Sequence, residues 1–131
     1  MNKGQRLYKF ILGLLMPFLF LACSSKERIK IDGGTFNVDG KDVQLICGEM
    51  HYARIPHEYW RDRLKRARAM GLNTISVYVF WNFHERQPGE FDFSGQADVA
   101  EFVRLAQEEG LYVILRPGPY ACAEWDFGGY P

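Results

Sequence analysis

The chain repeats a unit in which a helical stretch ends at a Gly-Leu pair and an apolar strand follows. The first pair is Gly71-Leu72, ahead of a strand predicted over 74–79, and the second is Gly110-Leu111, ahead of a strand predicted over 112–116. Glycine accepts the left-handed conformation that ends many helices. Another strand-like run ends at Cys47-Gly48, before the first helix. Strands that alternate with helices in this way predict parallel βαβ units.

The two helical stretches carry apolar residues at helical spacing. The first is predicted from about His57 to Ala69, after Pro56, a residue that suits the first turn of a helix. Its expected stripe is Trp60, Leu64, Ala67 and Gly71. The second is predicted from about Asp98 to Glu109, and its expected buried face is Val99, Phe102, Val103 and Ala106. Asp98 and Glu101 have the spacing of a capping box, which marks the start of this helix.

A short hairpin is predicted ahead of the repeat. Residues 35–38 and 43–46 flank Asp39-Gly40, a dipeptide that favours a tight turn between two strands.

Two architectures fit the repeat, an open doubly wound sheet and a (β/α)₈ barrel. No Gly-x-Gly-x-x-Gly motif follows a strand, so the sequence lacks the main evidence for a dinucleotide-binding fold. Each strand instead ends in a loop dense with aromatic, acidic and amide side chains, as at the C-terminal face of a barrel. Such a barrel needs about 250 residues. We therefore expect an α/β fold that holds about three of the eight βα units of a (β/α)₈ TIM barrel, preceded by the hairpin.

The first residues have the pattern of an export signal. Three basic residues precede an apolar run over 10–22, which has the length of a signal-peptide core. Ala22 precedes Cys23, and the segment 20–23 is similar to a bacterial lipobox, whose cysteine becomes lipidated. An ordinary signal peptide cut nearby and an uncleaved anchor are the alternatives.

The expected organisation is a lipoprotein signal peptide over 1–22, a linker over 23–34 and a truncated catalytic domain over 35–131. The expected location is the bacterial cell envelope, as an outer-membrane lipoprotein or in the periplasm, with a lipid on Cys23 as the membrane anchor.

Charge and cysteine content exclude two classes of protein. After residue 22, thirteen basic and sixteen acidic residues remain, and a net charge of −3 argues against nucleic-acid binding. Three cysteines do not make a disulfide framework. Cys47 is expected to be a buried free thiol.

The residues that could carry chemistry form three clusters at strand ends, over 48–54, 78–85 and 116–131. Sugars offer apolar C–H faces and a rim of hydroxyl groups, and aromatic rings beside carboxylates and amides complement both. The candidate platforms are Tyr78, Trp81, Tyr120 and Trp125. The candidate hydroxyl partners are Asn82, Glu85, Glu124 and Asp126.

Other interpretations of these residues stay open at this point. Trp81 and Phe83 could simply cover the end of the barrel. His51 and His84 have no spacing typical of metal ligands, so no metal is expected. Glu124 and Asp126 could be a catalytic carboxylate pair, although their spacing in one loop makes that arrangement awkward.

Arg116 shares its strand parity with Tyr112 and Ile114, so it should point inward and need a carboxylate partner.

Four segments, in this order, resemble blocks of glycoside hydrolase family 35, the β-galactosidases. They are 48–52 (GEMHY), 59–64 (YWRDRL), 78–85 (YVFWNFHE) and 115–131 (LRPGPYACAEWDFGGYP). The resemblance covers residues 30–131. It implies a (β/α)₈ barrel followed by β-rich domains, and removal of terminal β-linked galactose with retention of configuration, without a cofactor.

The resemblance also implies roles for particular residues. Tyr78 matches a tyrosine that contacts galactose, and Cys122, Ala123 and Glu124 match the wall of the sugar pocket, where Glu124 accepts hydrogen bonds from hydroxyl groups. The family's acid/base and nucleophile, two glutamates on later strands, have no counterpart among these residues, so the chain alone is expected to be inactive. A hydrolase of another β-glycoside and an inactive sugar-binding protein are the alternatives, and the oligomeric state stays open.

Overall fold

The computed structural model describes residues 28–131, which fall into two units, residues 28–44 and residues 45–131. The predicted signal peptide and Cys23 lie outside the described residues. Over residues 28–131, no helix has both the length and the apolar character that a membrane span requires.

The first unit is a three-stranded antiparallel sheet of β1 (Ile29–Asp32), β2 (Thr35–Val38) and β3 (Lys41–Val43). The turn predicted at Asp39-Gly40 is confirmed, with φ of 50° and 85° at its two residues. Val38 pairs directly with Lys41 across this two-residue turn, so β3 begins two residues earlier than predicted.

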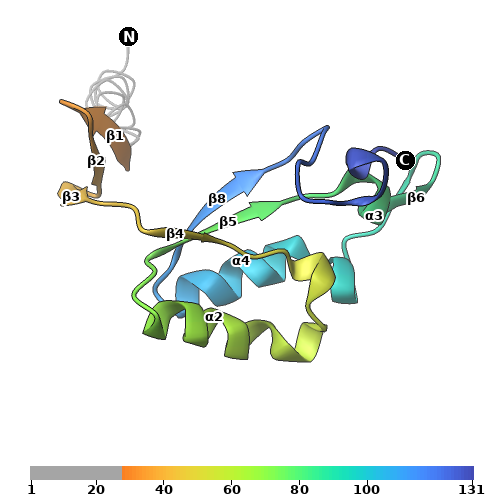
Figure 1. The fold of residues 1–131 in the computed structure, drawn as a ribbon, viewed down its shortest axis with the longest axis horizontal. Coiled ribbons are helices and arrows are strands. Elements are labelled where there is room, and N and C mark those ends of the chain that lie inside the picture. The colour runs from red at the N-terminus through yellow and green to blue at the C-terminus, as the bar shows by residue number, and fades with distance from the viewer. Residues whose placement is uncertain (1–27) are drawn as a thin grey trace, which may run out of the picture. The chain divides into compact units, whose positions relative to one another are not determined.

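The second unit contains the predicted βαβαβ arrangement. Its parallel sheet has the order β4 (Cys47–Glu49), β5 (Thr74–Tyr78) and β8 (Tyr112–Arg116). The helices α2 (Trp60–Ala69) and α4 (Val99–Glu108) connect these strands and lie together on one face of the sheet (Figure 1). Parallel strands with crossover helices are the building unit of α/β folds.

The helix ends follow the predicted signals. Gly71 and Gly110 adopt left-handed φ values of 94° and 73° after α2 and α4. The Asp98 side chain accepts a 2.8 Å hydrogen bond from the backbone N–H of Glu101, which caps α4. The helical stretch predicted from about His57 to Ala69 is confirmed, and its first turn, His57–Tyr59, is a 3₁₀ turn that leads directly into α2.

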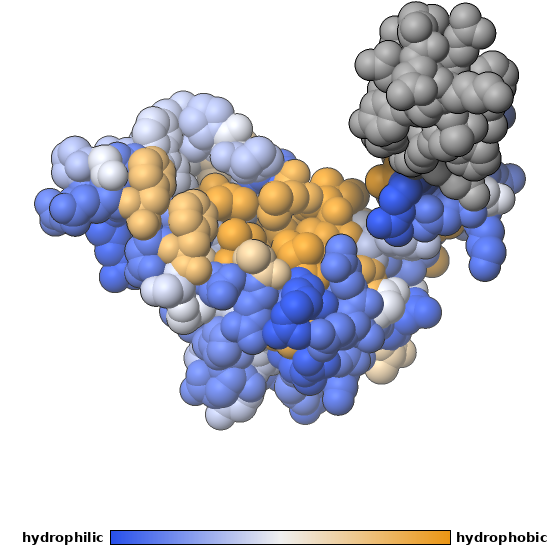
Figure 2. Space-filling view, turned by 180° about the vertical axis from the view of Figure 1, so that it is seen from behind, coloured by the Kyte–Doolittle hydropathy of each residue, from blue (hydrophilic) through white to orange (hydrophobic). Residues whose placement is uncertain are grey.

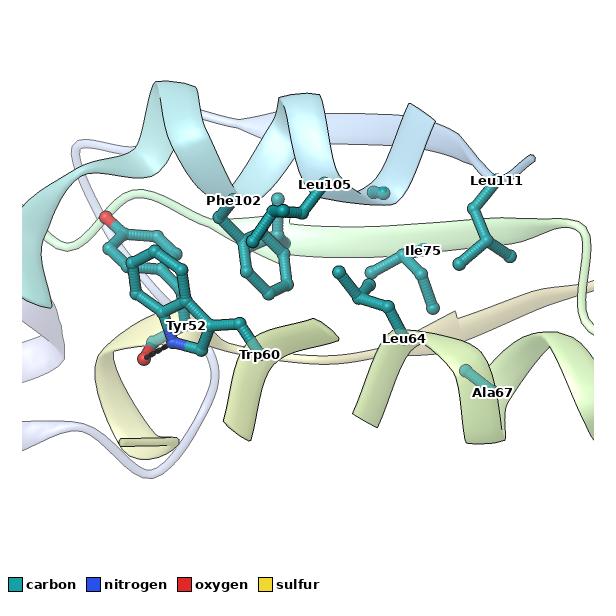
Figure 3. Close-up of a cluster of buried hydrophobic side chains, with 10 residues drawn as sticks. Tyr52, Trp60, Leu64, Ala67, Ile75, Phe102, Leu105 and Leu111 are labelled. Carbon is teal, nitrogen blue, oxygen red and sulfur yellow. Dashed lines mark hydrogen bonds between the residues drawn. The ribbon is translucent and has the colours of Figure 1, made fainter. Parts of the chain in front are cut away.

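The core of this unit lies between the two helices and the sheet (Figure 3). Of the predicted stripe, Trp60, Leu64 and Ala67 are buried on α2, whereas the inclusion of Gly71 was wrong, because Gly71 is exposed and lies beyond the end of the helix. On α4 the buried residues are Phe102, Leu105 and Ala106, whereas Val99 and Val103 are only partly buried.

Short elements occupy the loops that follow β4 and β5. A 3₁₀ turn at Tyr52–Arg54 follows β4. The loop after β5 holds α3 (Trp81–His84), the hairpin of β6 (Glu85–Gln87) and β7 (Glu90–Phe91), and a 3₁₀ turn at Gly95–Ala97. Another 3₁₀ turn, Asp126–Gly129, lies in the loop after β8.

On the face of the sheet opposite the helices, the residues of the two outer strands, β4 and β8, are exposed. Tyr112 and Ile114 are 42% and 41% exposed, and Figure 2 shows hydrophobic residues gathered on the side of the molecule hidden in Figure 1. Cys47 aligns with Thr74 and Tyr112 in the sheet register and is also exposed. The expectation that Cys47 is a buried thiol was therefore wrong: it has the strand parity of the face that the helices leave open.

Candidate functional site

The candidate site lies where β4, β5 and β8 end. Because these strands are parallel, their carboxyl ends meet at one edge of the sheet, and the loops that follow them converge there (Figure 1). Tyr78, Phe80 and Ala121 form a buried cluster against which Ala123 and Trp125 pack. The structure thus brings the candidates Tyr78, Ala123 and Trp125 together.

Arg116 points to the open face of the sheet and has the expected carboxylate partner. One guanidinium nitrogen donates to the Glu49 carboxylate at 2.8 Å, and another donates to the Tyr78 hydroxyl. The guanidinium carbon lies 3.8 Å from the centre of the Tyr78 ring. Arg116 thus lies on the same face as Tyr112 and Ile114, as its strand parity predicted, and its partner is Glu49, a residue to which the sequence had given no separate role.

His51 lies beside this group and is 9% exposed. The backbone N–H of Tyr78 donates to Nδ1 at 3.5 Å, and Nε2 lies 3.9 Å from the Glu49 carboxylate. Burial lowers the pKa of His51 below its usual value of 6.5, with smaller contributions from neighbouring charges. The ring is therefore neutral at pH 7.

Acidification should destabilise the protein through His51. Below pH 6.5 the unfolded chain binds a proton at this histidine and the folded chain does not, so stability falls as the pH falls. As the pH falls below about 6.5, the thermal midpoint of the whole protein should fall more steeply than that of a His51→Asn variant. Parallel midpoint-against-pH curves for the two proteins would contradict this account.

Hydrogen bonds connect the loop over 117–131 to the loops that follow β4 and β5. One Arg54 nitrogen donates to the carbonyl oxygens of Ala123 and Glu124, at 2.5 and 2.7 Å. The Trp125 indole donates to the Asn82 side chain at 2.7 Å, and Asn82 donates to the Asp126 carbonyl at 3.1 Å. The predicted neighbours Asn82 and Trp125 therefore do meet, whereas Arg54 had not been singled out from the sequence.

Several of the remaining candidates are exposed. Cys122 is an exposed free thiol. Glu124 is also exposed, and its backbone has a left-handed conformation, with φ of 48°. Trp81 is 38% exposed, donates its indole N–H to Glu85, and has its ring 6.1 Å from that of Tyr130. Trp81 is thus associated with Tyr130, while Phe83 packs against the core.

Both histidines considered as metal ligands have protein partners. His84 is buried, with Nδ1 2.8 Å from the Asp92 carbonyl and Nε2 bonded to the Tyr52 hydroxyl. Burial raises the pKa of Tyr52, so this hydroxyl keeps its proton. Within residues 28–131, no group of three or more His, Cys, Asp or Glu side chains is arranged to hold a metal ion.

Comparisons with known proteins identify relatives of this chain. Residues 35–131 match the family described as glycosyl hydrolases family 35. The chain is 55% identical to a beta-galactosidase of Xanthomonas manihotis over 120 residues, which are 92% of this chain and 20% of that protein. It is 57% identical to the Bos taurus beta-galactosidase over 125 residues, which are 90% of this chain and 19% of that protein. The chain thus spans about a fifth of the length of these relatives.

Two solved structures share the fold. A beta-galactosidase from the psychrophilic Marinomonas ef1 superposes with a TM-score of 0.53 at 23% identity, covering 63% of this chain and 12% of that chain. An endogalactoceramidase superposes with a TM-score of 0.53 at 23% identity, covering 66% of this chain and 21% of that chain.

Proposed function

Because this chain belongs to glycosyl hydrolase family 35, we propose that the whole protein removes terminal β-galactose from galactosides. The relatives at 55% and 57% identity are named beta-galactosidases. The observation that carries the proposal for this chain is the convergence of Tyr78, Ala123 and Trp125 at the carboxyl ends of three parallel strands. In this proposal residues 45–131 supply about three of the eight βα units of a (β/α)₈ barrel, whose active site lies at that end of the strands.

The role of this chain in the proposed reaction is to bind the sugar. We name Tyr78, Cys122, Ala123 and Glu124 the sugar wall. The exposed Glu124 carboxylate accepts hydrogen bonds from galactose hydroxyls. The Tyr78 oxygen already accepts from Arg116, so its own O–H is left to donate to a sugar oxygen.

The bond-breaking chemistry in this proposal belongs to two carboxylates. In a retaining glycosidase one carboxylic acid protonates the leaving oxygen, while a carboxylate about 5–5.5 Å away attacks the anomeric carbon. Water then releases the sugar from the covalent intermediate. The family resemblance assigns both groups to later strands of the whole protein, and none of the reacting groups to residues 28–131.

A panel of nitrophenyl glycosides tests the assignment. The purified whole protein should release nitrophenol from the β-galactoside at least about tenfold faster than from the β-glucoside or N-acetyl-β-glucosaminide, since the wall must distinguish hydroxyl positions. Proton NMR should show β-galactose as the first product. The 131-residue chain by itself should show no turnover. Cleavage of only a non-galactoside would overturn the assignment, and no cleavage of any glycoside would favour an inactive sugar-binding protein.

Export and lipidation at Cys23 form a separate proposal, supported by the basic and apolar pattern of residues 1–22. Cells that express the whole protein should incorporate labelled palmitate into it, and a Cys23→Ser variant should lose the label. Equal labelling of both proteins would contradict lipidation at Cys23.

A further inference from the structure

We propose that Arg54 is a positioning residue that holds the sugar wall in its binding conformation, an inference that rests on the proposed function. Arg54 lies just after β4, and its bonds reach backbone carbonyls 69 and 70 residues further along the chain. It makes these bonds to the segment that contains Glu124 without itself belonging to the sugar wall.

The backbone of the sugar wall has an unfavourable conformation at Glu124, which contacts with the rest of the protein must stabilise. Glu124 has φ of 48°, a conformation that residues with a side chain rarely adopt. This turn directs the carbonyls of Ala123 and Glu124 to a single Arg54 nitrogen, at 2.5 and 2.7 Å. Charge-assisted bonds of this kind are stronger than neutral ones. They therefore favour the backbone turn that sets the direction of the Glu124 side chain.

Arg54 also contacts the residue that follows the sugar wall. Its guanidinium carbon lies 5.3 Å from the centre of the Trp125 ring, within the range of a cation–π contact. Trp125 in turn stacks on Phe80, with ring centres 4.0 Å apart and an angle of 14° between the planes. The Arg54 contacts thus fix both the carbonyls and the ring of one short segment, residues 123–125.

The chemistry of these contacts requires a guanidinium. Its planar N–H donors can bond two carbonyls while its face lies against an aromatic ring, which the compact ammonium of lysine does less well. An Arg54→Lys variant should therefore keep the charge but lose much of the positioning.

The test measures galactose binding in the whole protein. The Ki of galactose as a competitive inhibitor should rise about tenfold or more in Arg54→Ala and by a smaller factor in Arg54→Lys, with kcat/KM falling in the same order. Guanidinium ion added to Arg54→Ala should lower the Ki again. Arg63→Ala is the matched control, because Arg63 also lies over an aromatic ring, Tyr59, at 6.0 Å, but outside the site.

A merely structural role for Arg54 would reduce the folded fraction without changing the Ki of the active molecules. An unchanged Ki in both Arg54 variants would overturn the inference. The result would be different if the proposed function itself were wrong, because the wild-type protein would then cleave no galactoside.

A second readout does not depend on turnover. The alkylation rate of Cys122, measured by mass spectrometry as the ratio of the variant's rate to that of the wild-type protein, should change several-fold in Arg54→Ala and not in Arg63→Ala. An unchanged ratio in Arg54→Ala would count against the inference.

Discussion

Replacement of Glu124 by glutamine is expected to lower kcat/KM of the whole protein for a β-galactoside by about 10²-fold. A hydrogen bond to a charged group contributes about 1.5–3 kcal/mol, and each 1.4 kcal/mol corresponds to a factor of ten. The amide has nearly the shape of the carboxylate, but it loses the charge and presents an N–H donor to the sugar hydroxyls. Steady-state kinetics on nitrophenyl β-galactoside measures the effect.

Asp126 provides the matched control for this experiment. It is an exposed acidic residue two positions further along the same loop, and its backbone carbonyl, which a substitution retains, accepts from Asn82. The family resemblance gives Asp126 no place in the sugar wall, so Asp126→Asn should change kcat/KM by less than about threefold. If Glu124 and Asp126 were instead the catalytic pair, both variants would lose about 10⁴-fold or more in kcat, and the sugar-binding role of Glu124 would be wrong.

Replacement of Arg116 by methionine should lower kcat/KM by about 10-fold to 10²-fold, again from the loss of bonds to a charged group. The substitution removes the donor to the Tyr78 hydroxyl and leaves the Glu49 carboxylate without its 2.8 Å partner. Because Tyr78 is 4% exposed, a hydroxyl group without a hydrogen-bond partner would be unfavourable there, and we expect the ring to shift so that the hydroxyl binds another group.

The control for the Arg116 variant is Arg66→Met on α2. Arg66 bonds Asp62 at 2.8 Å on the exposed helix surface, where such pairs contribute little. This variant should retain wild-type kinetics. Wild-type kcat/KM in Arg116→Met would show that the Glu49–Arg116–Tyr78 group has no part in sugar binding.

The elements that the sequence predicted well have local causes. The strand at Tyr112–Arg116 was predicted at its observed bounds, since Gly110 ends the helix before it and the apolar run follows at once. The face of the sheet on which Arg116 lies followed from strand parity alone.

The features that the sequence did not predict depend on contacts between distant parts of the chain. The bonds from Arg54 go to backbone carbonyls, which every residue has, so no side-chain pattern marks them. Glu49 became identifiable as the partner of Arg116 only once the sheet register placed β4 and β8 on either side of β5. The exposure of Cys47 likewise depends on which face the helices cover.

A crystal structure of the whole protein with bound galactose tests the central claim most directly. The account predicts that the sugar lies at the carboxyl ends of β4, β5 and β8, with the Glu124 carboxylate within about 3.2 Å of galactose hydroxyls and Tyr78 in contact with the ring. Arg54 should still bond the carbonyls of Ala123 and Glu124. Galactose bound elsewhere, with Glu124 facing solvent, would contradict the account.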